Sequence, residues 1–134
     1  MTTFSEEIDR VCEEEGFRSE FYEDHMGNMT IGHGIHRIEP DESRLVVSQR
    51  MHKLHRQILA NKTHLITQPD EVMFILVHMA YQMGLQGLYG FGQMFKAIKL
   101  KDYEWAADEM LNSKWAQQTP ARTNRLADRM RALV

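Results

Sequence analysis

The chain has 134 residues, of which 43% are hydrophobic and 26% charged, and its net charge is −3. These values fit one globular domain with a core of its own. They disfavour a general nucleic-acid binder, and with no apolar run long enough to cross a bilayer we expect no stable membrane insertion. The single Cys12 excludes an internal disulfide.

The first third of the chain predicts a helix followed by a hairpin. Thr3-x-x-Glu6 forms a capping box at the start of the helix, and Gly16 is placed to end it. Ser19–Glu23 and Met29–His33 then predict two short strands around a turn-rich pentapeptide.

The rest of the chain has helical patterns. Pro40 opens a helix that runs to about residue 61, and Thr67-x-x-Asp70 is expected to cap a third helix. That third helix is apolar on almost every side, so we expect it to be buried. After a break at Gly84, Gly87 and Gly90, further helices are expected near Gln93–Leu100, after Asp102 and after Thr119-Pro120.

Together these elements predict a mostly helical α+β fold in a single domain, residues 1–134. We expect a small lobe at about 16–40, an interlobe helix at about 41–61, and a helical lobe at about 62–134 that also takes in the N-terminal helix 3–15. A hairpin attached to a helical bundle leaves a cleft, and polymeric ligands bind in clefts.

Two acids and a threonine are the candidates for chemistry. Glu15 ends the first helix, where the helix dipole and burial against the bundle would raise its pKa and keep it protonated as a general acid. Asp24, at the hairpin tip, is expected to be solvated and ionised. Thr30 on the returning strand could hold a water beside Asp24. Two carboxyl groups with separated pKa values are what glycoside hydrolysis requires.

Three blocks of sequence, in order, resemble the phage lysozymes of the T-even type. The first is Glu15-Gly-Phe-Arg-Ser-Glu-Phe-Tyr-Glu-Asp24 with Gly27, Thr30-Ile-Gly32 and Gly34. The second runs from Tyr81-Gln-Met-Gly84 to Gly90-Phe91. The third joins Ser113-Lys-Trp115 and Gln118-Thr-Pro120 to Arg122 and Arg125.

The resemblance implies a role for each matching residue. Glu15 would be the general acid, Asp24 the second carboxylate and Thr30 the residue that helps to place the attacking water. Arg122 would approach Glu15, and Arg125 would pair with Glu14. The implied substrate-binding residues are Gln82, Gly32 and Tyr81, although Tyr81 is expected to serve packing more than binding. Inversion through a water activated by Asp24 and direct nucleophilic attack by Asp24 both remain open.

The implied activity is a muramidase that cleaves the β-1,4 bond between N-acetylmuramic acid and N-acetylglucosamine in bacterial peptidoglycan. We expect a monomeric phage endolysin without cofactor or metal, made in the host cytoplasm without a signal peptide. It would reach the wall in the periplasm after a separate holin-like membrane protein acts. The alternatives are a virion-associated lysozyme and a non-catalytic binding or structural protein on the same fold.

The chain also departs from the family pattern. Only residues 35–43 separate Gly34 from the interlobe helix, so much of the small lobe is reduced. The family histidine after the last hairpin glycine is Ile35 here, and its acidic partner falls at about Arg50.

Two chemical alternatives stay open beside hydrolysis. His33-x-x-His36 and His52-x-x-His55 have a spacing that can chelate zinc, against the simpler interpretation as surface histidines. A lytic transglycosylase would cleave the same bond without water.

Overall fold

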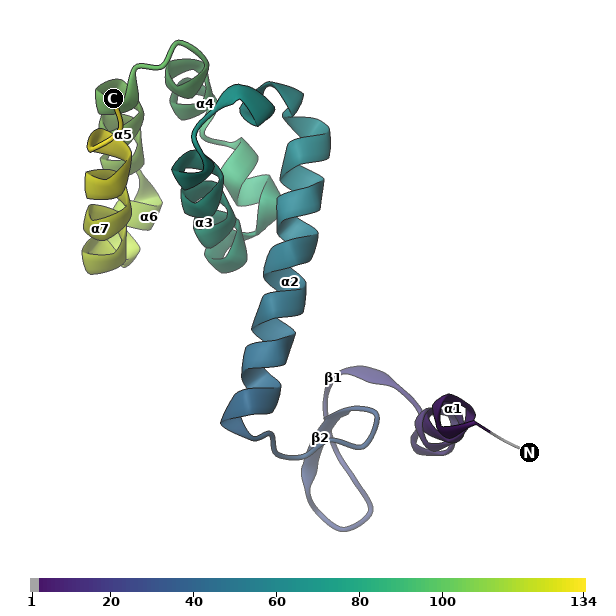
Figure 1. Cartoon of the computed structure of the whole chain (residues 1–134). Coiled ribbons are helices and arrows are strands. Elements are labelled where there is room, and N and C mark those ends of the chain that lie inside the picture. The colour runs from purple at the N-terminus through teal and green to yellow at the C-terminus, as the bar shows by residue number, and fades with distance from the viewer. Residues whose placement is uncertain (1–2) are drawn as a thin grey trace. The chain divides into compact units, whose positions relative to one another are not determined.

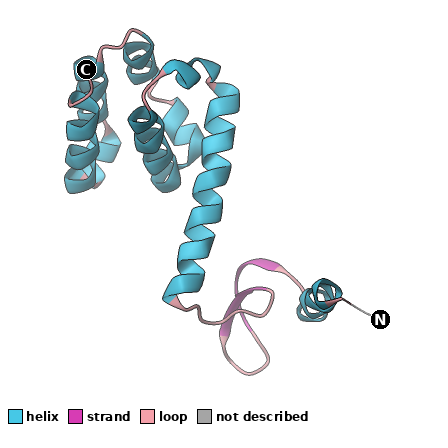
Figure 2. Cartoon of the chain, in the orientation of Figure 1, coloured by secondary structure: helices cyan, strands magenta, loops and turns pink. Residues whose placement is uncertain are grey.

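The computed structural model describes residues 3–134 and divides into two compact units, Met1–Val46 and Val47–Val134. The boundary falls inside the long helix α2 (Pro40–Asn61). Both described strands belong to the first unit, and the second unit is helical (Figure 2). The mostly helical α+β class predicted from the sequence is confirmed.

The first unit begins with helix α1 (Phe4–Glu15; Figure 1). The predicted capping box is present: the Glu6 amide donates to the Thr3 hydroxyl, and the Thr3 amide donates to the Glu6 carboxylate. Gly16 ends the helix at φ 70°, a left-handed conformation that favours glycine. No residue of α1 is buried, and its apolar residues Phe4 and Ile8 are exposed.

The predicted hairpin consists of β1 (Arg18–Glu23) and β2 (Met29–Gly32). The strands are antiparallel, with Tyr22 opposite Thr30, and the register shifts between Arg18 and Tyr22. After β2 the chain turns back so that Ile31 and Ile35 exchange both backbone hydrogen bonds. The hairpin thus returns the chain close to the end of α1 before α2 starts.

In the second unit, a short 3₁₀ helix η1 (Thr63–Thr67) leads from α2 into α3 (Asp70–Tyr89). The expected Thr67 cap is wrong. The Thr67 hydroxyl donates to the carbonyl of His64 inside η1 at 2.9 Å, and α3 starts after Pro69 without a side-chain cap.

The predicted glycine break is only partly correct. Gly84, at φ 79° and ψ 167°, kinks α3, but the helix continues through Gly87 to Tyr89. Four helices follow: α4 (Gly92–Lys99), α5 (Tyr103–Leu111), α6 (Lys114–Gln118) and α7 (Pro120–Arg131). Asp102 caps α5 by accepting the Trp105 amide, and Pro120 opens α7, both as predicted.

The buried core lies in the second unit and is built around α3, as its apolar sequence predicts. Eight α3 residues are buried, whereas Phe74 is 56% exposed. The largest fully buried apolar side chains are Ile58, Ile75, Leu76, Met79, Leu88, Met94, Ile98, Met110, Met130 and Val72.

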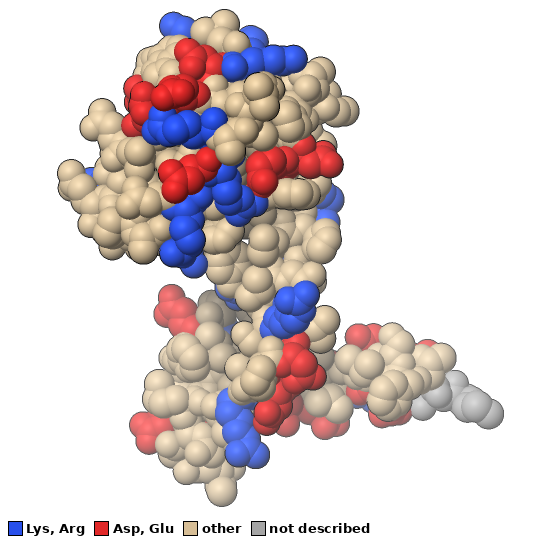
Figure 3. Space-filling view, turned by 60° about the vertical axis from the view of Figure 1, so that its left-hand side comes forward, with Lys and Arg blue, Asp and Glu red and all other residues tan. Residues whose placement is uncertain are grey.

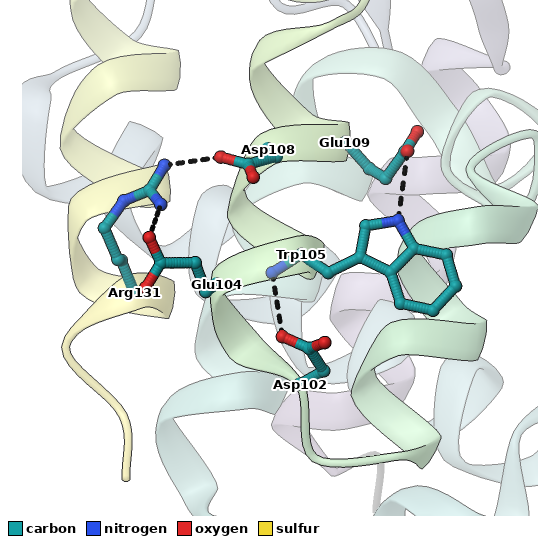
Figure 4. Close-up of polar contacts among 6 residues, drawn as sticks. All are labelled: Asp102, Glu104, Trp105, Asp108, Glu109 and Arg131. Carbon is teal, nitrogen blue, oxygen red and sulfur yellow. Dashed lines mark hydrogen bonds and ion pairs between the residues drawn. The ribbon is translucent and has the colours of Figure 1, made fainter.

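Ion pairs join α7 to its neighbours at the edge of this core. The Arg131 guanidinium donates to Glu104 at 2.9 Å and to Asp108 at 3.0 Å, both on α5, while Trp105 Nε1 donates to Glu109 (Figure 4). Arg129 pairs with Glu71 of α3. Accordingly, basic and acidic side chains are interspersed on the face of the second unit seen in Figure 3.

Among residues 3–134, no helix combines the length and the apolar character needed to span a bilayer. The sequence also predicts that α1 packs with the helical lobe. Since α1 belongs to the first unit and the lobe to the second, this packing stays a prediction.

Candidate active site

The hairpin tip holds Asp24 in a fixed orientation. Its Oδ1 accepts hydrogen bonds from the amides of Met26 at 2.9 Å and Asn28 at 2.8 Å. Its Oδ2 accepts one from the Thr30 hydroxyl at 3.1 Å. Asp24 is thus an Asx-type turn residue, whose carboxylate closes the turn that its own backbone begins.

These donors favour the charged form of Asp24. The Asn28 amide is the strongest of the influences that lower the pKa of the carboxyl, and the Met26 amide and Thr30 hydroxyl act in the same direction against partial desolvation. The expectation of an ionised Asp24 at the hairpin tip therefore has a physical cause in the local backbone.

Thr30 is buried, with 2% of its surface exposed. Its hydroxyl contacts Asp24 directly and also lies 3.0 Å from the carbonyl oxygen of Asn28. The sequence predicted a water between Thr30 and Asp24, whereas the structure has a direct hydrogen bond that orients the carboxylate.

Glu15 is the last residue of α1, as predicted, and its carboxyl group lies against Gly34. A methyl group added at Gly34 would come within 3.1 Å of Glu15 Cδ and 3.5 Å of Cγ. Gly34 also has φ 74°, a backbone conformation that favours glycine, and a Cβ there would force the Glu15 carboxyl group to move. The turn after β2 therefore provides the surface on which Glu15 rests.

The Glu15 side chain is exposed, so residues 3–46 do not provide the apolar wall expected around it. Burial against the helical bundle, and the contacts of Arg122 with Glu15 and Arg125 with Glu14, would involve both units and stay predictions. Gly32, the candidate substrate-binding residue of the hairpin, ends β2 at φ 67° opposite Arg18.

In the second unit, Gln82 is the centre of a polar network. Its Oε1 accepts from Trp115 Nε1 at 2.8 Å and from Arg122 Nη1 at 3.0 Å, and its Nε2 lies 3.4 Å from the Thr119 hydroxyl. The kink at Gly84, two residues on, ends the regular part of α3 next to this network. Gln82 thus ties α3 to α6 and α7.

Three arginines of α7 act electrostatically on His78 of α3. Burial lowers the pKa of His78 first, and the positive charges of Arg122, Arg129 and Arg125 lower it further. Arg122 and Arg125, which the family resemblance selected, thus lie close enough to His78 to affect its charge.

Gln82 also lines an open pocket of about 730 Å³ in the second unit. Apolar side chains form part of the wall, including Phe91, just before α4, and Trp115 of α6, whose rings meet edge to face at 6.2 Å. Glu109 and Lys114 add one charge of each sign. A mixed apolar and polar lining of this kind is typical of ligand-binding pockets in general.

Tyr81 is 42% exposed and lines a separate pocket of about 360 Å³ with residues of α2. Tyr81 is thus neither fully buried nor fully exposed, and its expected role in packing rather than binding stays a prediction.

Neither histidine pair gathers a third candidate metal ligand within residues 3–134. No group of three or more His, Cys, Asp or Glu side chains within residues 3–134 has the arrangement to hold a metal ion. His52 instead contacts the Ser48 carbonyl through Nδ1 at 2.7 Å, and His33 packs against Phe17.

Comparison with known proteins gives these residues a family context. The sequence model of the family described as phage lysozyme matches residues 12–132. This chain belongs to the phage lysozyme family. Two probable T4-type lysozymes of Dictyostelium discoideum are each 41% identical to it over 51 residues. Each match covers 38% of the chain but only 30% of the relative.

Membership of the phage lysozyme family supports the predicted lysozyme-like α+β fold. Sequence reasoning singled out Glu15, Asp24, Thr30 and Gln82. It named Gly34 only as part of a motif, and it did not pair Gln82 with Trp115. The available signals were a glycine in a turn near the candidate acids and a polar residue after an apolar stretch of helix.

Proposed function

We propose that the chain is a muramidase that hydrolyses the β-1,4 bond between N-acetylmuramic acid and N-acetylglucosamine in peptidoglycan. The observation that carries the proposal is the fixed Asp24 carboxylate, held ionised by two backbone amides and Thr30, in a phage lysozyme chain whose Glu15 rests on Gly34. Glycoside hydrolysis needs two carboxyl groups in different environments, and these two differ in their donors.

In the proposed reaction, Glu15 donates its proton to the glycosidic oxygen as the bond to the anomeric carbon breaks. Asp24 accepts a proton from the attacking water, which yields an inverted anomer, and Thr30 keeps the Asp24 carboxylate in place. The alternative, direct attack by Asp24 on the anomeric carbon, would retain the anomeric configuration.

The first experiment separates these outcomes from each other and from a transglycosylase. Purified peptidoglycan strands are incubated with the protein, and the released ends are analysed by mass spectrometry and by proton NMR. Hydrolysis gives reducing ends that carry the mass of one added water. Inversion at the β-linked carbon releases the α anomer first, whereas retention releases the β anomer first. Anhydro ends would replace hydrolysis by a lytic transglycosylase reaction, and binding without release would favour a non-catalytic protein.

We further propose an endolysin role, in which the enzyme reaches the wall once a holin-like protein has opened the membrane. Family membership supports this role alongside that of a virion-associated lysozyme. Lysis of cells that express the protein only when a membrane-permeabilising protein is co-expressed would favour the endolysin. Recovery of the protein in purified virions would favour the other role.

A further inference from the structure

The middle of the chain is strongly basic although the protein as a whole is acidic. Between Ser43 and Pro69 there is no Asp or Glu. The same segment contains the cations Arg44, Arg50, Lys53, Arg56 and Lys62. Most of it is α2, so the positive charge is concentrated on one helix.

Two of these cations line a pocket. Arg50, Lys53 and Gln57 are three and seven residues apart on α2, a spacing that places them on one face of the helix. Together with Leu54 and with Tyr81 of α3 they enclose about 360 Å³. All five residues belong to the second unit.

The side chains in this pocket are available to a ligand. Arg50, Lys53 and Gln57 are exposed, and Tyr81 is 42% exposed. Within residues 3–134, the ion pairs found involve other cations, on α1 and α7, and neither Arg50 nor Lys53 has a carboxylate partner. The pocket therefore combines two uncompensated positive charges, an amide and one aromatic face.

We propose that this basic pocket binds a carboxylate-bearing sugar unit of the glycan strand, with Arg50 and Lys53 contacting the carboxylate and Tyr81 contacting the sugar ring. The inference rests on the proposed function, and it adds residues that select the acidic sugar over the neutral one. The N-acetylmuramic acid unit carries a carboxylate on its lactyl group or, where that group is amide-linked to a peptide stem, on the stem, whereas N-acetylglucosamine has none. A guanidinium binds a carboxylate through two parallel hydrogen bonds, and Gln57 can donate to a hydroxyl or amide oxygen.

Binding is measured by calorimetry in the full chain carrying Glu15→Gln, so that the strands stay intact. The ligands are soluble peptidoglycan strands and the same strands with their carboxylates converted to amides. We expect Arg50→Gln with Lys53→Gln to weaken binding of the untreated strands by about threefold to tenfold. The same pair should leave binding of the amidated strands unchanged, while Tyr81→Leu should weaken binding of both.

The matched control is Arg44→Gln with Arg56→Gln, which removes the same charge from α2 outside the pocket. If both pairs of substitutions weaken strand binding equally, a diffuse basic surface replaces the proposed pocket. The proposal is also overturned if Arg50→Gln with Lys53→Gln weakens binding of the amidated strands as much as binding of the untreated ones. A third arm uses phosphatidylglycerol vesicles. Vesicle binding that depends on Arg50 and Lys53, with strand binding that does not, would assign the pocket to a lipid surface instead.

Turnover by the unaltered protein separates this inference from the proposed function. Strand binding that depends on the pocket, without release of new ends, would reject hydrolysis and keep the pocket. Release of new ends, with binding independent of Arg50 and Lys53, would reject the pocket and keep hydrolysis.

Discussion

The Thr30 hydroxyl donates to the Asp24 carboxylate across 3.1 Å, from a side chain that is almost fully buried. Thr30, on the strand that follows the turn, thus orients the carboxylate of Asp24, the residue that begins the turn. Oδ1 of Asp24 already accepts two backbone amides, and Oδ2 accepts the Thr30 hydroxyl. Oδ2 is therefore the oxygen with room to accept a further hydrogen bond from a water.

Thr30→Val should disable the carboxylate without disrupting the fold. The substitution keeps the shape but removes the hydroxyl, so the pKa of Asp24 should rise and turnover should fall by roughly tenfold to a hundredfold. Carbon-13 NMR titration of Asp24 and release of reducing ends measure the two effects. Thr30→Ser, which keeps the hydroxyl, should retain most of the activity, and equal activity in Thr30→Val would refute the role.

Gly34→Ala should displace Glu15. The new methyl group would collide with the Glu15 carboxyl, and φ 74° is unfavourable for alanine by roughly 1–2 kcal/mol. Gly27→Ala provides the control, because Gly27 has φ 82° but only an ordinary contact at 3.7 Å. We expect both variants to lose stability in urea unfolding and only Gly34→Ala to lose most of its turnover. Similar turnover in the two variants would contradict the contact.

Gln82→Leu should destabilise the second unit. It leaves Trp115 Nε1 and the more exposed Arg122 without their shared acceptor. The loss at the buried Trp115 donor should cost about 1–3 kcal/mol. Thermal unfolding followed by tryptophan fluorescence reports the loss. Gln82→Glu keeps an acceptor and should be milder, so an unchanged melting temperature in Gln82→Leu would remove Gln82 from the network.

Acidification should destabilise the protein through two histidines. Burial and then Lys99 and Lys62 lower the pKa of His64, whose buried Nε2 has no hydrogen-bond partner among residues 3–134. Burial and the α7 arginines lower the pKa of His78. The unfolded chain binds these protons at about pH 6.5 and the folded chain only at lower pH, so stability is full above that pH and falls below it.

Unfolding by urea at a series of pH values between about 7 and 5 tests this expectation. His64→Leu should flatten the fall in unfolding free energy, whereas the same substitution at the exposed His36 serves as the control. An equally steep fall in His64→Leu would exclude His64 as a source of the pH dependence.

The elements of the fold that the sequence predicted correctly are those that depend on interactions between residues close together in the chain. The capping box at Thr3 and Glu6 and the cap at Asp102 act through neighbours in sequence, and the structure has both. The Thr67 cap failed because the same residue completes a 3₁₀ turn with His64, which competes for its hydroxyl. Gly87 failed as a break because it keeps a helical conformation, whereas Gly84 does not.

The sequence indicated which residues form the candidate site, but it did not indicate which neighbours each of them contacts. The spacing of Glu15, Asp24 and Thr30 marked the three side chains. The direct Thr30 contact and the support from Gly34 depend on how the hairpin returns to the end of α1. The exposure of Tyr81 depends on how α2 packs beside α3, which the apolar pattern of α3 alone does not define.

The most direct test of the proposed function is the rate at which reducing ends are released from purified peptidoglycan by Glu15→Gln beside the unaltered protein. Glu13→Gln, an exposed acid on the same helix, is the control, and circular dichroism verifies the fold. We expect Glu15→Gln to lower the rate by at least about a hundredfold, since it cannot donate the proton, with Glu13→Gln unchanged. An undiminished rate in folded Glu15→Gln would contradict the assignment of Glu15 as the acid.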